Sequence, residues 1–153
     1  MTFEERVKAY ELATAAFLDA VALVTPENID KADYAGWTPR QIVHHVADSE
    51  SQSAARLRRI LAQPGTQILG YDENVWSECE ALGYRTYPID NSLAFYEAAR
   101  ASSLEVLQHL TEADLSRFAI HSERGNFTLD DWLNVYASHP IDHANQLREA
   151  IGA

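Results

Sequence analysis

Two histidines close to the C-terminus have the spacing of metal ligands. His139 and His143 stand four residues apart in a segment with a helical pattern. Residues at that spacing project from one face of an α-helix, with roughly 5–6 Å between their Cβ atoms, so two imidazoles can bind one ion without distorting the backbone. His45, in another helical segment, could supply a third imidazole. Three nitrogen ligands leave one position open, which is the pattern of catalytic rather than structural zinc.

The helical repeat places these histidines on apolar faces. On the C-terminal segment the face recurs at spacings of three and four, through Trp132, Tyr136, His139, His143 and Gln146 or Leu147. On the upstream segment a comparable face consists of Ile42, His45, Val46 and Ser49. A lone histidine on such a face is more often a hydrogen-bonded core residue than a ligand. Because neutral imidazoles are costly to bury without partners, three that point inward favour a shared metal ion. His44 is rotated by about 100° from His45 and is expected to face elsewhere.

Carboxylates near the histidines could orient the rings. The second nitrogen of a metal-bound histidine commonly donates a hydrogen bond to a carboxylate. Asp48, close to His45, and Asp142, next to His143, are the local candidates. Each could equally be a surface acid, so the sequence leaves this role open.

Four long segments have the pattern of amphipathic helices, which predicts an all-α four-helix bundle. They run from Phe3 to about Val24, from Pro39 to about Ala62, from a cap at Asp90 or Ser92 to before Thr111, and from the cap Thr128 toward the C-terminus. The second helix has the strongest start, because Thr38 can cap it and Gln41 can close a capping box. The long connection from Gln63 to Asn91 should be partly structured, with a short helix from Glu73 to Ala81. Residues 118–127 have the pattern of a small hairpin.

Length and composition fit one soluble globular domain over residues 1–153. The net charge of −11 would repel phosphate backbones, so nucleic acid is not an expected partner. No apolar run approaches the roughly 18 residues of a membrane span, and the N-terminus lacks a signal-peptide pattern. The single cysteine, Cys79, excludes an internal disulfide, which favours the cytoplasm. Nothing near Cys79 in the sequence would activate it, and we expect a buried inert thiol.

Three stretches, spread over nearly the whole chain, together resemble the DinB/YfiT-like superfamily. They are Gly36-Trp-Thr-Pro-Arg-Gln-Ile-Val-His-His-Val-Ala-Asp-Ser49, Tyr71-Asp-Glu-Asn-Val-Trp76 and His139-Pro-Ile-Asp-His-Ala-Asn-Gln-Leu147. The resemblance implies an up-down-down-up four-helix bundle, often dimeric, with a divalent ion bound by one histidine of the second helix and two of the last. It gives these roles to His45, His139 and His143. The Tyr-Asp-Glu-x-x-Trp stretch is typical of the YfiT branch, whose members are provisionally named metal-dependent hydrolases, and other relatives are thiol S-transferases.

The chain departs from the family pattern at two positions. The last motif commonly reads His-x-x-His-His-x-Gly-Gln, but Asp142 replaces the first of the adjacent histidines and Asn145 replaces the glycine. Neither change touches an implied ligand, although both could alter the surroundings of the metal and the substrate preference. The long connection could close one side of the metal pocket, and we expect the substrate pocket to include Tyr71, Asp72, Trp76 and Gln146.

Pro140 stands between the two implied ligands of the last helix. A proline inside a helix removes one hydrogen bond and clashes with the carbonyl four residues back, at a cost of roughly 3 kcal/mol. Tyr136 should therefore have a free carbonyl oxygen, and a kink could adjust the aim of His139. The alternative is a tolerated proline whose lost hydrogen bond is replaced by water.

Three functions remain open at this point. The first is a hydrolase of a small electrophilic substrate that uses one divalent ion, zinc or nickel, since imidazole suits both metals. The second is an S-transferase with a thiol cosubstrate such as bacillithiol, mycothiol or glutathione. The third is a non-catalytic metal-binding helical module. A homodimer is expected from the resemblance alone.

Overall fold

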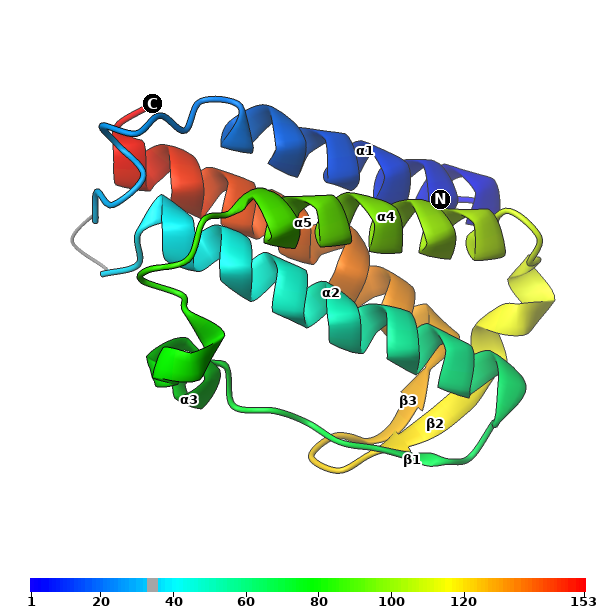
Figure 1. The fold of residues 1–153 in the computed structure, drawn as a ribbon. Coiled ribbons are helices and arrows are strands. Elements are labelled where there is room, and N and C mark those ends of the chain that lie inside the picture. The colour runs from blue at the N-terminus through cyan, green and yellow to red at the C-terminus, as the bar shows by residue number, and fades with distance from the viewer. Residues whose placement is uncertain (33–35) are drawn as a thin grey trace.

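The computed structural model describes residues 1–32 and 36–153. Within these residues, four long helices form the body of the molecule: α1 (Phe3–Val21), α2 (Pro39–Ala62), α4 (Asp90–Leu107) and α5 (Leu129–Ile151). Figure 1 shows that α1 and α5 run in one direction and that α2 and α4 run in the other. The expected up-down-down-up bundle is therefore confirmed. None of the described helices is both long and apolar enough to cross a membrane.

Capping explains why α2 has the bounds that the sequence predicts. The Thr38 hydroxyl accepts a hydrogen bond from the Gln41 backbone N–H at 3.2 Å, and the Gln41 side chain accepts one from the Thr38 N–H at 2.9 Å. This reciprocal pair satisfies donors that a helix start leaves free. Thr128 and Asp131 form the same box at the start of α5. By contrast, α1 ends at Val21 rather than near Val24, because the N–H groups of Leu23 and Val24 form turn-type bonds to carbonyls three residues back.

The helices pack around two clusters of apolar side chains. α1 lies against α5 and α2 lies against α4, and α2 also contacts α5. One cluster contains Trp132 and Tyr136, and the other contains Ala144 and Leu147. Along α5, His139 and His143 fall between these two groups. The sequence therefore interrupts an otherwise apolar face with two imidazoles where the clusters meet.

A small sheet and a few short helices complete the fold. The expected hairpin is present as β2 (Phe118–His121) and β3 (Gly125–Thr128), which pair antiparallel. A strand that the sequence does not reveal, β1 (Gln67–Ile68), pairs parallel to β2. The expected helix from Glu73 to Ala81 is divided at Cys79 into α3 (Glu73–Glu78) and the 3₁₀ turn η1 (Glu80–Leu82). A second 3₁₀ turn, η2 (Glu112–Ser116), precedes the hairpin.

The connection between α2 and α4 runs back along α2 (Figure 1). Its residues touch α2 at successive positions. The Tyr84 hydroxyl donates to Asp48 Oδ2 at 2.6 Å, and the Tyr87 carbonyl accepts from Arg40 at 2.9 Å. Glu73, at the start of α3, lies 3.5 Å from His45. This path brings Glu73 of the connection to His45.

Candidate metal centre

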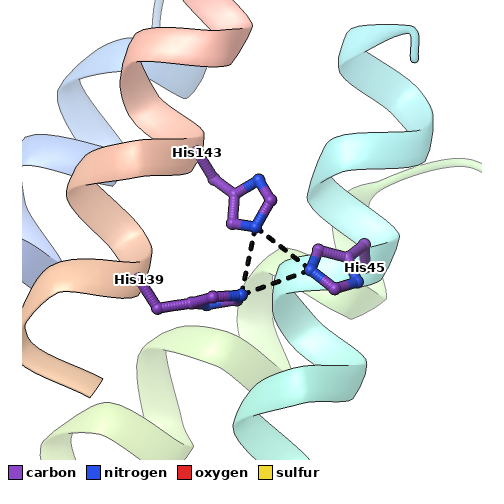
Figure 2. Close-up of side chains that lie close together, drawn as sticks. All are labelled: His45, His139 and His143. Carbon is purple, nitrogen blue, oxygen red and sulfur yellow. Dashed lines mark hydrogen bonds between the residues drawn. The ribbon is translucent and has the colours of Figure 1, made fainter. Parts of the chain in front are cut away.

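Three imidazoles converge in the bundle. His45 comes from α2, and His139 and His143 come from α5. Their Nε2 atoms lie 3.3 Å apart for His45 and His139, 3.1 Å for His45 and His143, and 3.0 Å for His139 and His143. Figure 2 shows the three Nε2 atoms pointing toward one another. Among the described residues, this is the one group of histidine, cysteine or acidic side chains with the spacing of a metal site.

Burial keeps these imidazoles neutral. It lowers the pKa of His45 to about 3, with a further contribution from His143. It also lowers the pKa of His139 to about 3, and the charges of His143, His45 and Arg100 act in the same direction. The pKa of His143 is lowered by burial as well, against the opposing effect of Gln146. Neutral imidazoles have free lone pairs, which is the form that binds a metal ion.

Hydrogen bonding alone cannot account for the triangle of Nε2 atoms. In a neutral imidazole each ring nitrogen is either a donor or an acceptor. Three such atoms in mutual contact must include at least one pair with the same role, so at most two of the three contacts can be hydrogen bonds. A cation at the centre would satisfy all three nitrogens, because each would direct its lone pair at it. The donor set therefore fits a divalent ion.

The partner of the His143 Nδ1 atom indicates which nitrogen of that ring carries the proton. His143 Nδ1 lies 2.7 Å from Gln146 Oε1, and a proton on Nδ1 that donates to this oxygen leaves Nε2 free for a metal. Gln146, three residues along α5, therefore orients the ring. His45 Nδ1 is buried and has no hydrogen-bond partner within the described part of the chain.

The structure does not give Asp48 or Asp142 the orienting role that the sequence suggested. Asp48 accepts the hydroxyl of Tyr84 at 2.6 Å, because the connection brings that tyrosine against α2. Asp142 is exposed, and its influence on His143 is limited to a favourable charge effect on the pKa of that ring. An amide, rather than a carboxylate, contacts the ring of His143.

Two further residues border the imidazoles and were not found by sequence reasoning. Glu73 Oε2 lies 3.5 Å from His45 Nε2. The Trp37 ring packs edge-on against His45, with 5.0 Å between ring centroids. Glu73 belongs to the Tyr-Asp-Glu stretch, but only the path of the connection along α2 shows that it reaches the histidines. His44 faces away as expected, toward Ser92 and the Tyr87 carbonyl.

The residues expected to line a substrate pocket have mixed roles. The Tyr71 and Trp76 rings pack against each other at a tilt, with 4.6 Å between their centroids, and both residues are partly exposed. Asp72 caps α3, since its Oδ1 accepts the backbone N–H groups of Asn74 and Val75. The Asp72 carboxylate therefore has a structural role as a helix cap. Gln146 contacts His143 and so lies at the imidazoles themselves.

The carbonyl that Pro140 leaves free has a side-chain partner. The Tyr136 carbonyl accepts from Arg100 Nη1 at 2.8 Å, so an arginine of α4, rather than water, replaces the lost helical bond. α5 remains helical through Pro140. The expected free carbonyl is thus present, and it connects α4 to the turn that carries His139.

Arg100 links all four long helices. It is 1% exposed and donates to Thr14 Oγ1 and to the Tyr10 carbonyl of α1 at 2.8 and 2.7 Å. Its guanidinium lies 3.5 Å from the Glu50 carboxylate of α2, which is also buried. Burial raises the pKa of Glu50, and the charge of Arg100 opposes that shift. Through these contacts one side chain sets the spacing between the helices that carry the three histidines.

The expectation of a buried Cys79 is wrong. The thiol is exposed, because the connection follows the outside of α2. It borders a cavity of about 360 Å³ together with Ser77, Tyr84 and Arg85. That cavity does not include the three imidazoles.

The fold is a four-helix bundle, and its histidine cluster has the spacing of a metal site. The chain belongs to the DinB superfamily, whose profile matches residues 9–147. This confirms the resemblance drawn from the sequence motifs.

The relatives of this chain carry names that refer to metal-dependent hydrolysis. A protein of Oceanobacillus iheyensis, provisionally named a metal-dependent hydrolase, is 33% identical over 71% of this chain, and the match spans 61% of that protein. YfiT of Bacillus subtilis, with the same provisional name, is 30% identical over 95% of this chain and 84% of its own length.

Solved structures agree with this relationship. The structure of YfiT from Bacillus subtilis, described as a probable metal-dependent hydrolase with an unusual four-helix bundle topology, has a TM-score of 0.82 at 29% identity, over 98% of this chain and 87% of that one. TT2238, described as a four-helix bundle protein, has a TM-score of 0.65 at 24% identity, over 96% of this chain and 98% of that one. The second likeness supports the fold alone.

Proposed function

We propose that this protein is a hydrolase that holds one divalent ion on His45, His139 and His143 and acts on a small electrophilic substrate. The observation that carries the proposal is the triangle of neutral Nε2 atoms, separated by 3.0 to 3.3 Å, whose contacts cannot all be hydrogen bonds. The names of the relatives support the same reading.

The spacing of the nitrogens agrees with a first-row divalent ion. Metal–nitrogen bonds of roughly 2.0–2.1 Å separate ligand nitrogens by about 3.3–3.4 Å in a tetrahedral site and by about 2.8–3.0 Å at right angles. The Nε2 distances of 3.0 to 3.3 Å lie between these limits. Zinc and nickel both suit imidazole ligands, and we propose one of these two.

The residues around the cluster have separable tasks in this proposal. When bound, the ion would supply Lewis acidity and lower the pKa of a water or thiol at its open position. Glu73, 3.5 Å from His45 Nε2, is the carboxylate placed to accept a proton at Oε2. Gln146 holds the ring of His143 through Nδ1. Trp37 packs edge-on against one side of the His45 ring.

Isotope labelling separates this function from its alternatives. The full-length protein, loaded with zinc or nickel, would be incubated with a panel of small esters and amides in water enriched in oxygen-18. A hydrolase places the label in the product without added thiol. A chelator and the His139→Ala variant should both abolish turnover, whereas His109→Ala, which changes an exposed histidine, should leave it unchanged.

The other outcomes point to the other functions. Product that forms only with bacillithiol, mycothiol or glutathione, and that carries the thiol, would contradict hydrolysis and identify an S-transferase. Metal binding without turnover under either condition would favour a non-catalytic helical module.

A further inference from the structure

A small cavity between α2, the hairpin and α5 has an unusual charge. Its volume is about 140 Å³, and its lining includes Arg56 of α2, Tyr71 of the connection, His121 and Arg124 of the hairpin, and Val135 of α5. Two guanidinium groups therefore border one small space in a protein whose net charge is −11.

Neither arginine is neutralised by a carboxylate. Within the described residues, the ion pairs of this chain include no partner for Arg56 or Arg124, although five other arginines have one. Arg56 donates to two neutral oxygens, the Tyr136 hydroxyl at 2.9 Å and the Leu69 carbonyl at 2.7 Å. Its Nε–H is shielded from solvent and has no acceptor among the described residues. Arg56 therefore brings to the cavity a positive charge that a bound anion would neutralise.

His121 adds a neutral donor to the same cavity. It is 5% exposed, and its Nδ1 accepts the backbone N–H groups of Glu123 and Arg124 at 3.1 and 3.3 Å. Nδ1 therefore carries a lone pair, and the ring proton is on Nε2. Burial and the charges of Arg56 and Arg124 lower the pKa of His121, so the ring stays neutral. The two contacts also fix the turn from which Arg124 extends.

Glu123 is the one acid in the lining of this cavity. Its carboxylate packs against Gly70, where an added Cβ would lie 2.6 Å from Glu123 Oε2. It forms no ion pair with either arginine within the described part of the chain. Together, the two guanidinium groups and this one carboxylate give the lining a net charge of +1, which a monoanion would neutralise. A planar carboxylate matches the fork of a guanidinium.

The cavity is close enough to the histidines to share a ligand with them. Val135 precedes His139 by four residues of α5, which is roughly 6 Å along the helix axis. Tyr136, whose hydroxyl contacts Arg56, lies in the same turn. On the opposite side, Tyr71 adjoins Glu73, whose charge acts on the Tyr71 phenol.

We propose that this cavity binds the carboxylate of a small monocarboxylate substrate through Arg56 and Arg124, while the reacting group of that substrate lies at the three histidines. The second half of this statement rests on the proposed function. The first half concerns an anion site that does not need the metal.

Binding of butyrate to the full-length protein tests the anion site. In an ¹⁵N NMR titration, the Arg56 Nε–H and the ring of His121 should shift in a saturable way. Arg124→Gln, at an exposed residue that leaves the core intact, should weaken binding about tenfold or more, as the loss of one charge-assisted hydrogen bond implies. Arg56→Gln should do the same, and Arg59→Gln, on the same helix but outside this cavity, should not.

Variants of the two arginines and a second anion show which results would contradict the proposed site. Butyrate binding that is unchanged in Arg124→Gln and Arg56→Gln, or that does not shift the Arg56 Nε–H, would overturn the site, and tighter binding of sulfate would overturn its preference for a carboxylate. His139→Ala should bind butyrate as well as the wild type does. If the wild-type protein binds neither zinc nor nickel but still binds butyrate, the proposed function is wrong and the anion site is retained.

Discussion

At the scale of single residues, the chemistry of this protein depends on which ring nitrogens are free. Burial removes the proton from three imidazoles, and their Nε2 atoms then face one another at 3.0 to 3.3 Å. Lone pairs that face one another repel unless a proton or a cation lies between them. The arrangement is therefore costly by itself and favourable around an ion.

Replacing Gln146 should weaken metal binding without removing a ligand. Its Oε1 lies 2.7 Å from His143 Nδ1, and loss of such an orienting contact typically costs 10–100-fold in metal affinity. Gln146→Ala should therefore raise the dissociation constant for zinc by about that factor, measured by competition with a chelating dye. Asp142→Ala is the matched control, because Asp142 is exposed. Equal loss in both variants would contradict the role given to Gln146.

The lowered pKa values predict how the metal-free protein responds to acid. Below pH 6.5 the unfolded chain binds protons at its histidines, whereas folded His45 and His139, with pKa values of about 3, do not. Their contribution to stability is thus complete above pH 6.5 and is lost as the pH falls toward about 3. Denaturant unfolding across this range should show a smaller acid loss in His139→Leu than in the wild type or in His109→Leu. The same pH dependence in all three proteins would argue against buried neutral imidazoles.

Sequence reasoning found the three histidines because i, i+4 spacing and apolar faces are local properties. It assigned carboxylates as their neighbours and overlooked Glu73. The position of Glu73 depends on a connection that folds back along α2, and no local pattern predicts that path. The contact between Gln146 and His143 could have been found, since residues three apart share a helix face.

At the scale of elements, Arg100 and Pro140 work as a pair. The proline frees the Tyr136 carbonyl, and the arginine uses it to join α4 to α5 at 2.8 Å. The same guanidinium lies over the Tyr10 ring, 3.4 Å from its centroid. The packing of α1, α2 and α5 around this side chain therefore determines how the histidines meet.

Arg100→Met should destabilise the protein strongly. It removes three hydrogen bonds and leaves the Glu50 carboxylate buried without its cation, which costs roughly 3–5 kcal/mol in comparable pairs. Chemical denaturation should show this loss, and adding Glu50→Gln should recover part of it. Arg59→Met, at an exposed arginine that donates only to the nearby Gln63 side chain within the described residues, should stay within about 0.5 kcal/mol of the wild type. A loss for Arg100→Met as small as that for Arg59→Met would contradict the linking role.

The helix bounds that the sequence predicted best are those marked by capping residues or a proline close by in the sequence. The bounds of α2 follow from a capping box and a proline at its start, and α5 begins after the capping residue Thr128. The strand β1 has two residues and exists because Gln67 and Ile68 pair with β2, a partner some fifty residues away along the chain. Such a strand has no periodicity of its own to detect.

At the scale of the whole molecule, the ion should contribute to stability. A ligand that binds only the folded state stabilises it by roughly 2.7 kcal/mol at a concentration of 100 times its dissociation constant. In a domain of this size, that corresponds to an increase in the melting temperature of several degrees. Calorimetry should show the increase in the wild type and not in His143→Ala. An equal increase in both would place the stabilising ion elsewhere.

The homodimer expected from the family resemblance stays a prediction.

X-ray absorption at the metal edge would show directly whether His45, His139 and His143 bind one cation. The zinc- or nickel-loaded protein should show the multiple scattering of about three imidazoles, with nitrogens at roughly 2.0–2.1 Å. His139→Ala should lose one imidazole from that shell or lose the metal. A spectrum dominated by sulfur or carboxylate ligands, or one that is unchanged in His139→Ala, would show that these three histidines do not hold the ion.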